Sequence, residues 1–187
     1  LNYDLSDGYI PRIYWTSIPG RLAVVYMNRQ QDELELSIVN VTDQTSRVVY
    51  QETSDSWIDI FDFFAGELNH FYFPEDLDEF FFISERDGWA HIYRINYDGK
   101  IKQVTEGAFE VTAIKAIDTK KKRIYFTSTE TSPLERHLYV IKFNGKGKER
   151  ITSAKGHHSV DVSPDGKYYF DRYSSTEQPG QVEFSST

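Results

Sequence analysis

One pattern of short strands and tight turns recurs along the chain about every 45 residues, and this repeat limits the fold more than any other feature of the sequence. The strand after the first turn of each unit begins at Leu22, Phe80, Ile124 and Tyr168, which gives intervals of 58, 44 and 44 residues. The two shorter intervals match the four-stranded blades of β-propellers, and the longer one predicts an inserted loop. A unit of this size cannot bury its apolar faces alone, so the repeat predicts sheets that stack on one another.

The composition agrees with an all-β domain and excludes several kinds of function. Aromatic residues make up 16% of the 187 residues, and they favour the half-buried surface of a sheet. The net charge of −8 argues against a nucleic acid or an anionic membrane face as a partner, and we interpret the lysine run at 120–122 as a solvated hairpin tip. The chain has no cysteine, which excludes disulfides and thiolate metal sites. No run approaches the roughly 20 apolar residues of a membrane span, and residues 1–6 lack the pattern of a signal peptide.

Strand and turn signals divide the chain into three complete units and part of a fourth. The predicted blades span residues 9–53, 57–105 and 109–152, with a partial blade at 157–187. The partial blade has predicted strands at 158–162 and 168–173, followed by turn formers at 174–180, and we expect no third or fourth strand in it. Because a closed propeller has four to eight blades, we predict an all-β partial β-propeller, an arc of about three to four four-stranded antiparallel blades.

Several strings in this repeat are distinctive. They lie at residues 9–16, 27–34, 84–93, 110–112, 132–139, 158–160 and 163–169. In this order they resemble the N-terminal propeller of the dipeptidyl peptidase IV family, in particular its bacterial members. The most specific are Glu-Arg-Asp-Gly-Trp at 85–89 and Pro-Leu-Glu-Arg-His-Leu-Tyr at 133–139. Ser-Pro-Asp-Gly-Lys at 163–167 is less specific, because many propellers use it as a turn.

The resemblance implies the later blades of an eight-bladed propeller that caps a C-terminal α/β-hydrolase. In this family the hydrolase is a serine exopeptidase, which removes N-terminal dipeptides with proline or, less well, alanine in the second position. The propeller gates the access of peptide substrates and positions the hydrolase. The implied partners are therefore the protein's own hydrolase domain and peptide substrates. The resemblance also implies a bacterial parent protein in the periplasm, at the cell surface or secreted.

The catalytic machinery of the family has no counterpart in this chain. The sequence contains no Gly-x-Ser-x-Gly nucleophile elbow, and none of its five histidines has the α/β context of a catalytic triad. The family's paired glutamates, which bind the amino group of the substrate, are also missing, since the chain has no Glu-Glu pair. We therefore expect no catalytic, cofactor-binding or metal-ligating residue here.

A loop after the first blade is the candidate for contact with substrate. In vertebrate members an arginine on the loop that follows the position of Trp57 touches extended substrates, whereas residues 58–64 of this chain contain no arginine. If the loop lines the substrate cavity, its lining is acidic and aromatic. The candidate residues are Trp57, Asp59, Phe61 and Asp62.

The charged signature strings have a structural interpretation. Asp87 and Gly88 are predicted to make a bend, with Arg86 pairing across it. The next blade is predicted to place its Glu-Arg-His string at the equivalent junction of loop and strand. The residues assigned this structural role are Glu85, Arg86, Asp87, Gly88, Trp89, Glu135, Arg136 and His137.

Three other groups could be functional, but a structural role is favoured for each. His157 and His158 could bind a metal, yet neighbouring residues of a strand point to opposite faces. A group of acidic residues could bind a hard cation, but its spacing fits no calcium loop, which favours a solvated rim; the group is Glu52, Asp55, Asp59 and Asp62. The tryptophans are expected to be core aromatics between stacked blades; they are Trp15, Trp57 and Trp89.

The alternative to a peptidase propeller is a non-enzymatic periplasmic scaffold of the TolB type, which shares the Asp-Gly turns. A Gly-x-Ser-x-Gly segment beyond Thr187 would identify the peptidase, which we favour. In both cases we expect the isolated chain to expose unpaired strand edges and apolar faces at its first and last blades. The apolar faces would include Tyr14, Trp15 and residues 168–170. We expect these faces to drive self-association.

Overall fold

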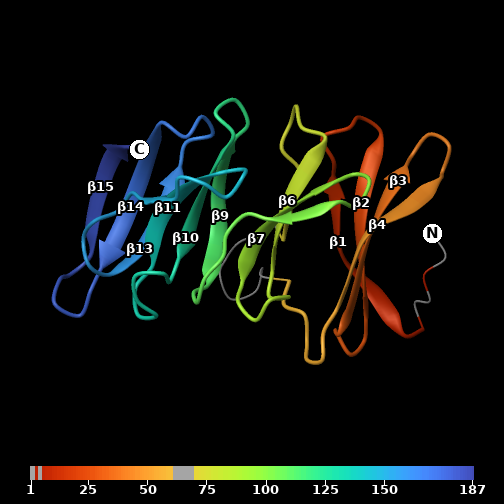
Figure 1. The fold of residues 1–187 in the computed structure, drawn as a ribbon, viewed down its shortest axis with the longest axis horizontal. Coiled ribbons are helices and arrows are strands. Elements are labelled where there is room, and N and C mark those ends of the chain that lie inside the picture. Colours follow the sequence, from red (N-terminus) through yellow and green to blue (C-terminus); the bar gives the residue numbers. More distant parts are fainter. Residues whose placement is uncertain (1–2, 4–5, 61–69) are drawn as a thin grey trace.

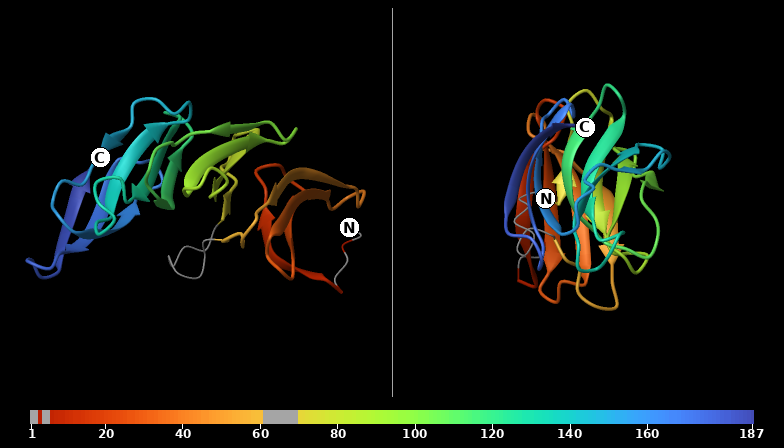
Figure 2. Two further views of the ribbon diagram at one scale, coloured as in Figure 1. Left: turned by 60° about the horizontal axis from the view of Figure 1, so that its bottom comes forward. Right: turned by 90° about the vertical axis from the view of Figure 1, so that its left-hand side faces the viewer.

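Four antiparallel β-sheets follow one another along an arc, in the order of the sequence (Figures 1 and 2). The computed structural model describes residues 3, 6–60 and 70–187, and the regular secondary structure of these residues is all β-strand. The first three sheets have four strands each and the fourth has three, and the arc stays open (Figure 2). The prediction of an all-β partial propeller is confirmed.

Each sheet is a meander in which strands consecutive in the sequence pair with each other. The first sheet contains β1 (Gly8–Trp15), β2 (Arg21–Asn28), β3 (Glu33–Asn40) and β4 (Ser46–Thr53). The second contains β5 (Phe71–Tyr72), β6 (Glu79–Ser84), β7 (His91–Asn96) and β8 (Ile101–Gln103). The third contains β9 (Val111–Asp118), β10 (Arg123–Ser128), β11 (His137–Lys142) and β12 (Glu149–Arg150). The fourth contains β13 (His157–Val162), β14 (Tyr168–Ser174) and β15 (Gln181–Ser186).

Strand β15 corrects the sequence prediction that the fourth unit has no third strand. It pairs with β14 over its whole length, with Phe184 opposite Phe170. Val182 and Phe184 alternate with polar residues, but their side chains are 62% and 69% exposed on the outer face of the sheet. The segment therefore lacks the buried apolar run by which the other strands were recognised.

Strand β6 shows why the inner sheets carry continuous apolar runs. Phe80 and Phe82 belong to the apolar cluster that joins the second sheet to the first, and the ring of Phe82 packs on that of Tyr50 in β4. Phe81 and Ile83 belong to the cluster shared with the third sheet. Successive residues of a strand point to opposite faces, and both faces of this sheet are covered. Four consecutive apolar residues thus hold three sheets together.

The three tryptophans correct another expectation, because none of them lies in the core between sheets. The exposed fractions are 70% for Trp15, 56% for Trp57 and 41% for Trp89. Trp15 ends β1, Trp57 lies in the connection after β4, and Trp89 lies in the loop between β6 and β7. Trp15 thus shares an exposed face of β1 with Ile13, and Trp57 and Trp89 lie in connections outside the strands.

Hairpin glycines allow neighbouring sheets to approach closely at the outer strands. Gly99 and Gly145 occupy turns of the second and third sheets with φ angles of 85° and 79°, which favour glycine. A Cβ atom on Gly99 would lie 3.0 Å from the carbonyl oxygen of Val49, and one on Gly145 would lie 2.9 Å from that of Val104. Each turn thus packs on the outer part of the preceding sheet.

Candidate functional site

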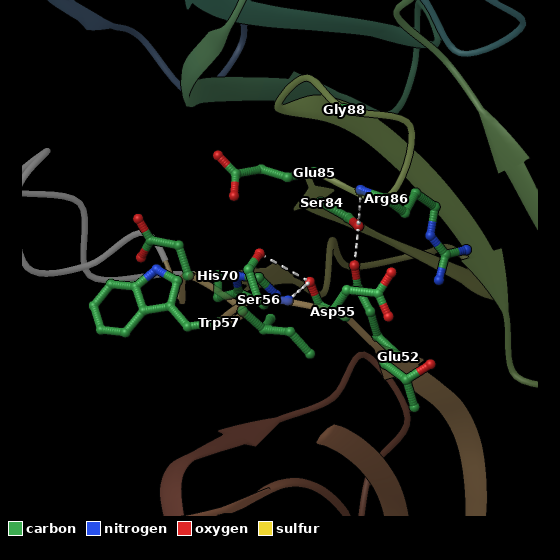
Figure 3. A pocket seen from close by; sticks show the side chains of 13 residues that line it. Glu52, Asp55, Ser56, Trp57, His70, Ser84, Glu85, Arg86 and Gly88 are labelled. Atoms are coloured by element: carbon green, nitrogen blue, oxygen red, sulfur yellow. Dashed lines mark hydrogen bonds between the residues drawn. The ribbon is translucent and has the colours of Figure 1, made fainter. Parts of the chain in front are cut away.

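A pocket of about 560 Å³ lies between the first and second sheets, at the edge where β4 and β6 end (Figure 3). One wall comes from the end of β4 and the connection that follows it, and the other from the end of β6 and the turn after it. Its lining residues are Glu52, Thr53, Ser54, Asp55, Ser56, Trp57, Ile58, Asp59, His70, Ser84, Glu85, Arg86 and Gly88.

A buried hydrogen-bond network closes the base of this pocket and links the two sheets. The carboxylate of Glu52 accepts hydrogen bonds from the hydroxyls of Tyr50 and, at 2.5 Å, Ser84. The hydroxyl oxygen of Ser84 in turn accepts from the backbone N–H of Arg86 at 3.2 Å, as Figure 3 shows. Burial and the neighbouring charge of Glu52 raise the pKa of Tyr50 well above its ordinary value, so Tyr50 stays protonated and donates. Glu52 is only 8% exposed, which corrects its assignment to a solvated rim.

Arg86 reaches from the second sheet to the first. Its guanidinium carbon lies 5.2 Å from the ring centre of Tyr50 and 5.4 Å from that of Tyr93, which is cation–π geometry. Its Nη2 also donates to the hydroxyl of Tyr50 at 3.0 Å. The side chain therefore stacks between the two sheets. This position corrects the prediction that Arg86 pairs across its own turn.

The turn after β6 is formed by its backbone and by Asp87. Gly88 has a φ angle of 94°, and its N–H donates to the carbonyl oxygen of Glu85 at 2.8 Å. The Asp87 carboxylate accepts from the backbone N–H of Trp89 at 3.4 Å and from the Gln103 side chain at 2.5 Å. The turn is thus tied to β8 of its own sheet.

The rim of the pocket is acidic. Three carboxylates line it: Asp55 and Glu85, which are exposed, and Asp59, which is half-buried. Burial first, and then the charges of Glu110 and of two carboxylates of the pocket, raise the pKa of Glu85 above its ordinary value. The part of this shift that comes from the neighbouring carboxylates reflects local negative charge, which attracts cationic groups.

Two of the four predicted cavity residues, Trp57 and Asp59, lie on this pocket. The other two, Phe61 and Asp62, lie outside the described residues. His70 also lines the pocket, although the sequence did not point to it. Burial lowers the pKa of His70 to about 3. His70 is therefore neutral at physiological pH.

The Glu135–Arg136–His137 string does not occupy the position equivalent to Glu85 and Arg86. Glu85 and Arg86 follow the end of β6, whereas Glu135 and Arg136 precede the start of β11. The residue equivalent to His137 is His91, because each begins the third strand of its sheet opposite a serine.

These two equivalent histidines form a repeated contact that the sequence analysis missed. The Nδ1 atoms of His91 and His137 lie 3.1 Å from the hydroxyl oxygens of Thr105 and Thr152. Each threonine hydroxyl also accepts the backbone N–H that follows the histidine. The similar spacing of the two pairs along the chain is the signal that could have revealed them.

Over the ranges 6–60 and 70–187, together with residue 3, no three histidine, cysteine, aspartate or glutamate side chains come together in a metal-binding arrangement. His157 is exposed and His158 is buried, as expected of neighbours in a strand. The same part of the chain contains no helix that could span a membrane.

The fold and the pocket define the chain as an open segment of a β-propeller, with a polar pocket at one edge of its stacked sheets. The family described as the dipeptidyl peptidase IV N-terminal region matches residues 2–180, and the chain belongs to this family.

The relatives of known sequence and structure are much longer than this chain. The dipeptidyl peptidase 4 of Trichophyton rubrum is 33% identical to it over 97% of this chain and 24% of its own length. That of Arthroderma otae is 33% identical over 96% of this chain and 23% of its own length. The crystal structure of Porphyromonas gingivalis dipeptidyl peptidase 4 superposes on this chain with a TM-score of 0.88 and 28% identity. The superposition covers all of this chain and 26% of that protein's chain. The chain thus spans about a quarter of the length of the relatives it matches.

Proposed function

We propose that the chain is a non-catalytic propeller portion of a dipeptidyl peptidase IV-like serine exopeptidase, which removes N-terminal X-Pro or X-Ala dipeptides. In the parent protein it would help to gate substrate access and to position a C-terminal α/β-hydrolase domain as part of an eight-bladed propeller. The observation that carries this proposal is the family match over residues 2–180, and it favours a peptidase over the scaffold propeller considered from the sequence. We also propose that the parent protein is bacterial. It would lie in the periplasm or at the cell surface, or be secreted, and cell fractionation tests this location.

The pocket is the proposed contribution to substrate access. Trp57 offers an exposed aromatic surface, and Asp59 belongs to an acidic rim that would attract a peptide with basic residues. Phe61 and Asp62, later in the same connection, are proposed to continue this lining. The turn residues at 85–89 and the 135–137 string are proposed to hold the sheets in place rather than to contact substrate.

Exchange of pocket residues in the complete protein tests this role. We expect Trp57→Ala and Asp59→Asn to lower kcat/KM for peptides of several residues by about 3- to 10-fold, the loss of one or two weak contacts. Hydrolysis of a dipeptide chromogenic substrate should be unchanged, because it is too short to reach the pocket. Val41→Ala is the control, since Val41 is exposed in the turn between β3 and β4, at the end of the first sheet opposite to the pocket. Equal losses for long and short substrates would contradict the proposal.

The terminal sheets are proposed to make the isolated chain self-associate. The first sheet exposes Ile13 and Val48, and the fourth exposes Tyr168, Val182 and Phe184. Exposed apolar surfaces of this kind are commonly covered by association. Light scattering over a concentration series should show a rising mass, and exchange of Val182 and Phe184 for lysine should suppress the rise. A strictly monomeric wild-type chain at high concentration would refute this expectation.

A further inference from the structure

The contact between the third and fourth sheets combines a small apolar cluster with buried polar groups. Its buried apolar side chains are Tyr125, Leu138, Val140 and Val160. The backbones also meet at one point, where the N–H of His158 donates to the carbonyl oxygen of Arg136 at 3.0 Å. His158, whose N–H makes this bridge, also has a buried ring that contacts the fourth sheet and the connection leading into it.

The ring of His158 faces hydrogen-bond acceptors on both sides. Its Nδ1 lies 2.7 Å from Oδ2 of Asp171, and its Nε2 lies 2.9 Å from the carbonyl oxygen of Ala154. A carbonyl oxygen can only accept, and so can an ionised carboxylate. Both contacts are satisfied together when both ring nitrogens carry protons and the imidazole is positively charged.

Asp171 depends on this proton. Its side chain is almost fully buried, and its Oδ1 has no hydrogen-bond partner among the described residues. The bond from His158 to Oδ2 is thus the compensation that the structure gives this carboxylate. Loss of the proton would leave a buried negative charge beside a neutral ring, which is costly.

Other titratable and charged groups surround the pair. On β11 the ring of His137 lies 4.8 Å from that of His158, and its Nε2 donates to Glu135 at 2.7 Å. On β14 the ring of Tyr173 stacks at 5.0 Å, and its hydroxyl donates to Glu183 of β15 at 2.9 Å. Arg136 and the exposed His157 flank the backbone bridge.

Their combined effect on His158 has a clear direction. Burial, the largest single cause, would lower its pKa, but the hydrogen bonds to Asp171 and Ala154 and the charges of Asp171 and Glu135 together outweigh it. The pKa of His158 therefore lies above its ordinary value of 6.5.

We propose that the proton of His158 is a latch that fastens β13 to β14 and to the connection that leads into the fourth sheet. The latch is closed while His158 and Asp171 form an ion pair, and it weakens when His158 loses its proton. Because the folded state holds the proton more tightly than the unfolded chain, the stabilisation is complete below the unfolded pKa and is lost as pH rises through the folded pKa. The first two strands of the fourth sheet are thus held together more firmly in mildly acidic than in alkaline solution.

Two measurements on the whole 187-residue chain test the latch. In an NMR titration of the wild type, the His158 ring should titrate at a higher pH than His157, whose pKa is lowered by burial and by the charge of Arg136. In urea unfolding, the wild-type midpoint should fall between about pH 6 and about pH 9, and His158→Gln should reduce this fall. The matched control His157→Gln should not reduce this fall, because a histidine whose pKa is lowered by folding adds stability as pH rises and so opposes it.

A His158 ring that titrates at or below its ordinary value would overturn the proposal. So would the same change of the urea midpoint with pH in the wild type and in His158→Gln. If His158→Gln does not fold, the titration of the wild type alone decides.

Discussion

Replacement of Phe82 by alanine is expected to lower the free energy of unfolding by about 3–5 kcal/mol, the usual cost of removing a large aromatic side chain from a core. Phe82 is fully buried. Its ring centre lies 4.6 Å from that of Tyr50 in the first sheet and 5.5 Å from that of Phe71 in its own. The variant therefore leaves a cavity at the contact of two sheets, and urea denaturation measures the loss.

Leu134→Ala is the control for this experiment, because Leu134 is 87% exposed in the loop before β11. We expect a change within about 0.5 kcal/mol. Similar losses for both variants would mean that the two sheets do not share the packed core described above.

A second large effect is expected for Glu52→Ala, at about 1–3 kcal/mol, because the buried hydroxyls of Tyr50 and Ser84 lose their common acceptor. Glu52→Gln keeps an acceptor oxygen and should cost less. Urea denaturation of both variants measures the difference.

The control for the Glu52 variants is Glu106→Ala, since Glu106 is exposed. This exchange should leave the unfolding free energy within about 0.5 kcal/mol of the wild type. A Glu52→Ala variant as stable as Glu106→Ala would show that the network at the base of the pocket does not fasten the sheets.

The fold could be predicted from the sequence because its signals are local. The run at Phe80–Ile83 indicates a strand covered on both faces, and the Asn144–Gly145 pair indicates a hairpin turn. Strand β15 was missed because its apolar residues alternate in a short, exposed segment. The tryptophans are not in the predicted core because Trp15 lies on an exposed face of β1, and Trp57 and Trp89 lie in connections between strands.

The pocket could be predicted only in part. Trp57 and Asp59 follow from the position of the connection between two blades. The contact of Glu52 with Ser84, by contrast, joins residues that are 32 positions apart and depends on how two sheets stack. The placement of Arg86 between Tyr50 and Tyr93 has the same origin. No local pattern encodes such pairs, because each partner alone reads as an ordinary strand or turn residue.

The central claim is that this chain is a non-catalytic portion of a peptidase propeller, and a paired activity assay tests it most directly. The purified 187-residue chain and the complete parent protein are compared with a Gly-Pro chromogenic substrate and with a fluorophosphonate that labels active serines. We expect hydrolysis and labelling for the complete protein and neither for the chain, which lacks a nucleophile elbow. Hydrolysis by the chain alone, or a complete protein without activity and without a labelled serine, would contradict it.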